Sequence, residues 1–186
     1  MRLFPVFLAV IALSACSTAT NLASRLDTRQ NVGVCPPAGA LYNAARIVSF
    51  DAETELYTEI TYSGEITGVR LFCRYTDDDP ISAEIEIDFA FGRGPKGKSR
   101  QHDYTYWVAV TRRSGKVLDK VQLTVPVQFD ADNRATATEL IEDIEIPRAD
   151  ETISGANFEV VVGFELTEAE RRFNEEGRRF RLQTGT

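Results

Sequence analysis

The sequence predicts an all-β fold, an antiparallel β-sandwich followed by one C-terminal α-helix. Apolar and polar residues alternate with a period of two through most of residues 44–166, which is typical of strands with one buried face. Turn-forming residues separate these segments at short intervals, as in sandwiches and barrels. Long crossover helices are absent from the pattern, so we expect antiparallel pairing rather than a parallel α/β sheet.

The first element is an N-terminal export signal. Arg2 provides a positive charge, residues 4–13 form an apolar run, and small residues precede Cys16. A run of this length is too short to span a bilayer, so it predicts a cleaved signal peptide over residues 1–15. The letters Leu-Ser-Ala-Cys that end at Cys16 resemble the lipobox of bacterial lipoproteins. This resemblance implies cleavage before Cys16, a diacylglycerol thioether on its sulfur and an acyl chain on its amine.

The resemblance also implies where the protein resides. Two or more acyl chains anchor a protein stably, so lipidation at Cys16 would hold it permanently on a membrane. In well-studied lipoprotein systems an aspartate after the lipidated cysteine favours the inner membrane, and Ser17 stands there instead. We therefore expect the periplasmic face of the outer membrane, with the periplasmic face of the inner membrane as the alternative. No later apolar run is long enough for a transmembrane helix.

The charge of the chain narrows the classes of partner. The sequence holds 21 basic and 28 acidic residues, a net charge of −7. Loss of Arg2 with the signal peptide leaves 20 basic and 28 acidic residues, a net charge of −8. A general nucleic-acid-binding domain would be basic, so we expect no nucleic-acid partner.

Residues 16–34 are polar and rich in small side chains, and they predict a flexible tether with a mean span of about 25 Å. The sandwich domain is expected over residues 35–166. Once Cys16 carries lipid, Cys35 and Cys73 remain, and an even number in an oxidising compartment favours a disulfide between them. One histidine and no C-x-x-C pair give no zinc-like spacing, so we expect no metal and no cofactor.

Within the sandwich the clearest strand covers residues 81–91, whose odd-numbered positions are all apolar. Strands are also predicted at 104–111 and 121–129, with turns at 113–116 and 130–133. Pro126 indicates that the strand containing it is an edge strand or carries a bulge. Weaker alternation predicts five further strands, at residues 44–50, 56–62, 69–75, 135–146 and 158–166.

A C-terminal helix and tail are expected over residues 167–186. Thr167 and Glu170 have the spacing of a capping box, in which each side chain bonds to the backbone N–H of the other. One face of the helix would contain Ala169, Phe173, Gly177 and Phe180. We expect Phe173 and Phe180 to dock the helix on its own domain, and the alternative is an arm that packs on a partner or on the membrane surface.

Residues 92–99 match the P-loop pattern G-x-x-x-x-G-K-[ST]. A P-loop opens a helix, but strand periodicity follows here. The strand before a P-loop is buried on both faces, whereas residues 81–91 have one polar face. We therefore expect no nucleotide and interpret the segment as a long hairpin loop. Its cations are Arg93, Lys96, Lys98 and Arg100. The loop is either a solvated turn or a contact for lipid phosphates, cell-wall carboxylates or an acidic partner.

No pattern in the sequence indicates catalysis. Residues 77–79 are aspartates, but they lack the spaced ligands of an EF-hand loop and predict a turn. His102 lies beside Asp103, but no nucleophile-elbow pattern accompanies it. Consecutive outward positions of one strand hold Glu84, Glu86 and Asp88, which are more simply a solvent-facing row than a glycosidase pair.

We therefore expect a non-catalytic interaction or accessory subunit of the bacterial cell envelope. Trp107 is a further candidate contact residue, because its position in the alternation turns it outward unless another element covers it. An immunoglobulin-like topology is our first choice for the sandwich.

Two other functions are weighed against this one. Eight strands and a C-terminal helix on a lipid anchor resemble bacterial lipocalins, which would make the fold a closed eight-stranded barrel carrying a small apolar ligand. The glycine-x-tryptophan motif of lipocalins is missing, and no strand follows the helix. An envelope hydrolase would need a cleft that holds His102 with a serine and an acid.

Overall fold

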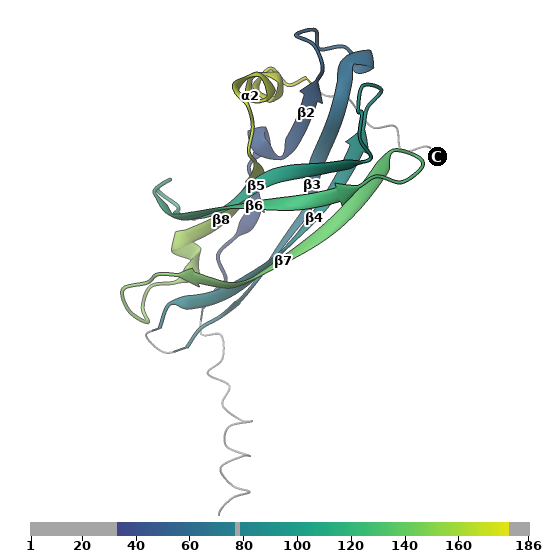
Figure 1. The fold of residues 1–186 in the computed structure, drawn as a ribbon. Coiled ribbons are helices and arrows are strands. Elements are labelled where there is room, and N and C mark those ends of the chain that lie inside the picture. Colours follow the sequence, from purple (N-terminus) through teal and green to yellow (C-terminus); the bar gives the residue numbers. More distant parts are fainter. Residues whose placement is uncertain (1–32, 77–78, 179–186) are drawn as a thin grey trace, which may run out of the picture.

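The computed structural model describes residues 33–76 and 79–178 and consists of two packed four-stranded β-sheets (Figure 1). The predicted all-β sandwich with one C-terminal helix is confirmed. The first sheet has the strand order β1 (Ala38–Ala40), β8 (Phe158–Phe164), β5 (Gln101–Arg112), β6 (Val117–Gln128). The second sheet has the order β2 (Arg46–Phe50), β3 (Ile60–Arg74), β4 (Ile81–Arg93), β7 (Arg134–Ile146). The helical elements are α2 (Glu168–Glu175) and the 3-10 turns η1 (Tyr42–Ala44), η2 (Tyr57–Glu59) and η3 (Gly155–Asn157).

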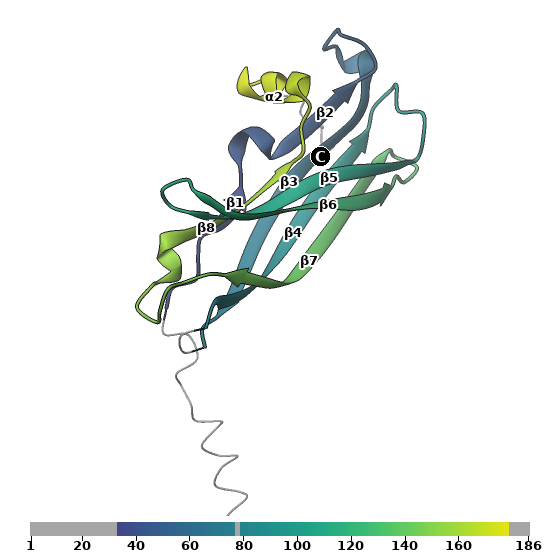
Figure 2. The same ribbon diagram turned by 60° about the vertical axis from the view of Figure 1, so that its left-hand side comes forward.

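The two sheets do not close into a barrel, so the lipocalin-like alternative is wrong. Within the described residues, β6 and β7 each pair with a single neighbour, as do β1 and β2. A closed barrel leaves no strand with an unpaired edge. Figure 2 shows β5 and β6 of the first sheet crossing over β3 and β4 of the second. The finer expectation of an immunoglobulin-like topology stays a prediction.

Most strands lie where the alternation predicts them, but two predicted strands are in fact one. The sequence indicates separate strands at 56–62 and 69–75, whereas β3 runs without a break from Ile60 to Arg74. Its pairing register with β4 shifts between Ile66 and Gly68. A bulge of this kind adds a residue on one strand and reverses the inside–outside alternation, which hid the continuity of β3.

Two further differences concern short segments. β1 pairs in parallel with β8, and its sequence Ala-Gly-Ala carries no periodic signal that would predict a strand. The loop over residues 94–100 is not a hairpin loop, because β4 and β5 lie in different sheets and the loop crosses between them. The turn at 113–116 is a hairpin, since β5 pairs with β6 and Gly115 has a φ of 84°.

Aromatic side chains fill the space between the sheets. Phe89, Phe91, Tyr104, Tyr106 and Phe164 are each at most 2% exposed. The rings of Phe91 and Tyr104 stack with their centroids 4.3 Å apart. The Tyr104 hydroxyl donates a hydrogen bond of 2.9 Å to the Ser63 carbonyl, so the polar end of this buried ring is satisfied.

Helix α2 packs on the edge of the second sheet through one large side chain. Phe173 is 2% exposed, and its ring lies 5.4 Å from that of Phe50 in an edge-to-face contact. The predicted capping box between Thr167 and Glu170 is present. Gly177 has a φ of 71°, so the chain leaves the helical path there and Gly177 does not extend the predicted face. Phe180 lies outside the described residues.

Different segments of the chain lie at the two ends of the sandwich. The described chain begins at Gly33, beside the turn between β3 and β4 (Figure 1). The Tyr75 hydroxyl joins the segments at this N-terminal end, because it donates to the Val34 carbonyl at 2.6 Å and accepts from the Gly155 N–H at 2.7 Å. Strand β4 spans about 40 Å at the usual rise per residue. Its far end leads into the 94–100 loop, on the side of the molecule away from Gly33.

Candidate functional site

The predicted lipidation site, Cys16, lies outside the described residues together with the signal peptide. Among residues 33–76 and 79–178, no helix is long and apolar enough to cross a membrane.

The predicted disulfide between Cys35 and Cys73 is confirmed, with the two Cα atoms 5.7 Å apart. Cys73 lies one residue before the end of β3, and its side chain packs against the main core. The bond therefore fixes the segment that enters the domain to the second sheet, at the N-terminal end of the sandwich.

The four predicted cations lie at the end of β4 and in the 94–100 loop, and their surroundings differ. Arg93 is half-buried and donates from Nε and Nη2 to Asn133 Oδ1, at 2.9 and 2.6 Å. It also donates to the Gly97 carbonyl at 3.2 Å, so it ties the loop to the turn between β6 and β7. Lys96 Nζ lies 3.4 Å from Glu59 Oε2.

The remaining two cations form no ion pair among the residues that the structure describes. Arg100 donates to the Asp130 carbonyl at 3.4 Å, whereas Lys98 has no ion pair or side-chain hydrogen bond within the described part of the chain. The proposed partner contact through this loop stays a prediction, and Lys98 is the side chain best placed to make it.

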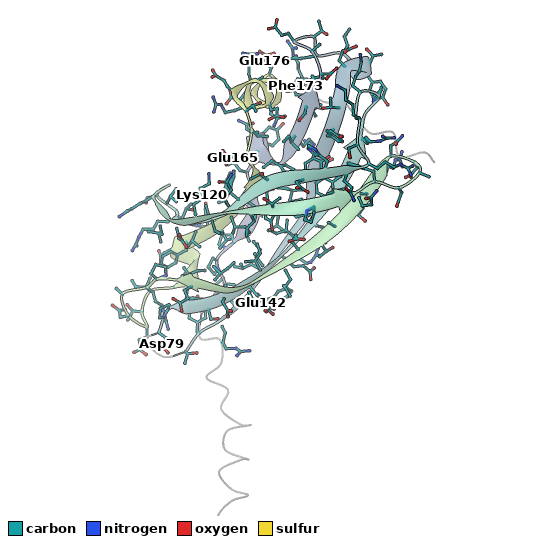
Figure 3. The ribbon with its side chains drawn as sticks, viewed as in Figure 1. Asp79, Lys120, Glu142, Glu165, Phe173 and Glu176 are labelled. Atoms are coloured by element: carbon teal, nitrogen blue, oxygen red, sulfur yellow. A yellow bond between two sulfur atoms is a disulfide. The ribbon has the colours of Figure 1, made fainter. Side chains whose placement is uncertain are left out.

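Trp107 points to the outer face of the first sheet, as its position in the alternation predicts, but it is half-buried there. Its indole Nε1 donates to the Phe164 carbonyl at 3.2 Å, and Lys120 Nζ lies 4.8 Å from the ring centroid. Lys120 also pairs with Glu165 at 3.6 Å (Figure 3). A Cβ added to Gly163 would lie 2.6 Å from the indole. These contacts give Trp107 a packing role, and its role as a contact residue stays a prediction.

His102 closes one end of the aromatic core. Its ring stacks on that of Tyr62 at 3.9 Å and meets Tyr104 edge-on at 4.6 Å. Burial lowers the pKa of His102, and the charges of Asp103 and Glu170 oppose this shift. In the described residues its ring makes no hydrogen bond to a serine.

The structure reveals an exposed apolar surface that the sequence analysis did not single out. Phe72 on β3 is 52% exposed and Leu140 on β7 is 55% exposed. Phe72 faces Glu84 across the β3–β4 pair, and Leu140 faces Glu86 across the β4–β7 pair. Because Glu84 and Glu86 lie on the face of β4 opposite its buried isoleucines, Phe72 and Leu140 both lie on the outer face of the second sheet.

A β-bulge in β7 hollows this face. Ala83 pairs with Ile144 and Ile85 with Ile141, so Glu142 and Asp143 together oppose the single residue Glu84. Asp143 has a φ of 58°, which aspartate adopts more readily than most residues. The hollow has a volume of about 350 Å³, and its lining side chains include Phe72, Arg74, Ser82, Glu84, Glu142 and Asp143. We call this surface, with Leu140 at its margin, the bulge face.

Negative charge at the bulge face is only partly balanced. Arg70 forms ion pairs with Glu86 and with Asp88, the latter at 2.6 Å. A hydrogen bond of 2.8 Å from Thr138, together with Arg70, lowers the pKa of Asp88. No ion pair reaches the carboxylates of the hollow itself from any residue of 33–76 or 79–178. Those carboxylates are Glu84, Glu142 and Asp143.

Part of this surface had a signal in the sequence. Residues 69–75 hold apolar side chains at every odd position, so the alternation places Phe72 on the outward face with Arg70 and Arg74. Leu140 shares its parity with Thr136 and Thr138, but the bulge two residues later has no mark in the sequence. Comparison of the chain with protein-family models, curated proteins and solved structures finds no match.

Proposed function

We propose that this protein is a lipid-anchored, non-catalytic interaction subunit of a bacterial cell-envelope assembly, and that it docks a partner protein on the bulge face. The observation that carries the proposal is the exposed pair Phe72 and Leu140 beside a hollow in an otherwise polar sheet face. Exposed apolar side chains that adjoin a concave surface with a polar rim are typical of protein interaction sites.

Export and anchoring are supported by two features at the N-terminal side of the chain. The first is the lipobox resemblance at Cys16. The second is the Cys35–Cys73 disulfide, because disulfides persist in oxidising compartments such as the periplasm. We propose the periplasmic face of the outer membrane as the location, with that of the inner membrane as the alternative.

The position of the bulge face suits a tethered subunit. Phe72 is adjacent to Cys73, whose disulfide holds the segment that leads to the tether. Figure 3 shows Glu142 on the same side of the molecule as Asp79, in the half that contains the N-terminal end. The docking surface is therefore held close to the point where the tether joins the domain.

The anchor is tested with Cys16→Ser in the full chain. We expect loss of labelled palmitate incorporation and loss of the protein from the membrane fraction, because neither thioether nor acylated amine can form. Retention of label in the variant would exclude Cys16 as the lipidation site.

Docking is tested by crosslinking the tagged, lipidated protein in cells and identifying captured proteins by mass spectrometry. We expect one dominant envelope protein with the native chain and its loss with Phe72→Ser combined with Leu140→Ser. The matched control is Leu56→Ser with Val117→Ser, which alters two residues that are 60% and 55% exposed elsewhere. All four positions are exposed, so each pair should change stability by about 1 kcal/mol or less.

Two results would count against the proposal. One is the absence of any specific protein capture by the native chain. The other is equal loss of capture in both variants, because a docking role requires the bulge face to differ from other exposed apolar positions.

A further inference from the structure

We infer that the partner segment received by the bulge face is cationic and amphipathic, with arginine or lysine next to apolar side chains. This inference rests on the proposed function and adds the chemistry of the partner. It follows from the charge, the shape and the neighbours of the hollow.

The charge of the hollow selects a cation. Its lining includes three carboxylates, Glu84, Glu142 and Asp143, and one cation, Arg74. Arg70 does not balance them, because it is engaged with Glu86 and Asp88 on the next positions of β4. Complementary charge steers partners to a surface and rejects those of like charge, so this hollow favours a positive segment.

The aromatic and aliphatic side chains select an apolar component beside that cation. Phe72 lines the hollow and is half-exposed, so its ring is open to a contact. An arginine guanidinium stacks on aromatic faces and also donates to carboxylates, which matches a hollow that contains both. Leu140 lies across β4 from Arg70, outside the hollow, and offers an apolar neighbour for a second side chain of the same segment.

The same charges argue against two other occupants. A membrane with anionic lipids would be repelled by unbalanced carboxylates at its surface. A second copy of this chain docking face to face would bring two sets of these carboxylates together, which costs free energy. A basic, partly apolar segment of another protein would not be repelled in either way.

The experiment places a photoreactive benzoylphenylalanine at position 140 in the full lipidated chain and irradiates living cells. We expect capture of one envelope protein at a segment that carries arginine or lysine among apolar residues. Neutralisation of the hollow by Glu84→Gln, Glu142→Gln and Asp143→Asn should lower the yield about tenfold, because charge-pair losses at interfaces commonly exceed this factor. Asparagine suits position 143 because it tolerates positive φ.

A charge-matched control separates the hollow from net charge. Glu53→Gln, Glu168→Gln and Glu175→Gln remove three exposed carboxylates from the other end of the domain and should leave the yield unchanged. Thermal unfolding of both triple variants verifies that each remains folded. Equal loss of yield in the two would show a nonspecific charge effect and overturn the inference.

Several other outcomes also decide the matter. Capture at an acidic or uncharged segment, capture of lipid alone, capture of a second copy of this chain, or insensitivity to the hollow variant would overturn the inference. If position 140 captures nothing while the same photoreactive residue at position 98 captures an envelope protein, the interaction role stands and the bulge face is not its site. If no position captures a protein, the proposed function fails with the inference.

Discussion

Gly163 lacks a side chain at a place where Trp107 occupies the space. A Cβ there would lie 2.6 Å from Trp107 Cζ2 and 2.7 Å from the Ala44 Cβ. We expect Gly163→Ala to displace the indole, break its hydrogen bond to the Phe164 carbonyl, and lower the free energy of unfolding by about 1–3 kcal/mol. Trp107 is the single tryptophan of the chain, so its fluorescence reports the displacement directly as a red shift.

The matched control is Gly39→Ala, because an added Cβ at Gly39 has no atom within 4 Å. It should leave both fluorescence and stability unchanged. An unaltered spectrum in Gly163→Ala would show that the indole is not packed against β8.

His102 should make stability depend on pH in the mildly acidic range. Burial lowers its pKa from the usual 6.5 despite Asp103 and Glu170. The unfolded chain then binds a proton that the folded chain resists, so the free energy of unfolding falls as pH drops from about 7 to about 5. Urea unfolding across this range should show the decline, and His102→Phe, which keeps the ring stack on Tyr62, should flatten it.

The carboxylates with a lowered pKa affect stability in a lower pH range than His102 does. Asp88 and Asp150 have pKa values below their usual 3.8, so their stabilising effect is lost only as pH falls below about 4. An unchanged slope between pH 7 and 5 in His102→Phe would therefore assign the decline to a group other than this histidine.

For single residues of the candidate sites, the sequence predicts the charge but not the partner that each charge finds in the fold. The cations of the 94–100 region look alike in the sequence, yet Arg93 and Lys96 are fixed by Asn133 and Glu59. Their partners lie about 40 residues away in the chain and meet them only because β4 pairs with β7 and β3 in the second sheet. Among the described residues of this region, Lys98 alone keeps the unpaired, exposed character that the charge pattern indicates for the whole loop.

At the level of elements, strands with regular alternation were predictable and strands with bulges were not. β4 alternates without interruption, and its predicted bounds differ from the observed ones by two residues. The alternation predicts two strands in place of β3, because the bulge near Gly68 reverses it. β1 has no alternation of its own, and it forms a strand only because it pairs with β8. Pro126 correctly indicated an edge strand, since β6 has β5 as its partner on one side only among the described strands.

Helix α2 should owe its position to Phe173. Its ring is buried with Val48, Ile60 and Phe50, while the rest of the short helix is largely exposed. We expect Phe173→Ala to cost about 3 kcal/mol of unfolding free energy, since it removes a buried aromatic ring. Arg171→Ala, on the exposed face of the helix, should cost less than about 0.5 kcal/mol. Urea unfolding of both variants measures the difference.

Backbone amide exchange extends this prediction to the contacts that the helix makes. Ser49 donates to Glu170 at 2.6 Å, and Asn174 donates to the Asn43 and Arg46 carbonyls at 2.8 Å each. If Phe173 positions the helix, amides of α2 should lose protection in Phe173→Ala while those of β4 keep it. Equal effects of Phe173→Ala and Arg171→Ala on stability would contradict this role.

For the whole molecule, the open sandwich poses a problem that a barrel avoids, because unpaired strand edges invite other chains. β6 carries the exposed Pro126 in its edge, and β7 carries a bulge and the half-buried Glu139. Glu139 pairs with the fully buried Ile87 and therefore points inward, where burial and then the charge of Glu139 raise the pKa of Tyr106. Inward charges and bulges are devices that protect edges from strand addition. Under the proposed function, they favour partner binding on the sheet face rather than on its edge.

This reasoning predicts that Glu139 keeps the domain from associating through β7. Glu139→Val removes the inward charge and leaves a long apolar edge, so we expect concentration-dependent oligomers by sedimentation. Glu145→Val makes the same chemical change at an exposed outer position opposite Ser82 and should remain in the native association state. If both variants behave alike, charge loss alone controls association. If neither associates, the bulge at Glu142 and Asp143 suffices to protect the edge without the inward charge.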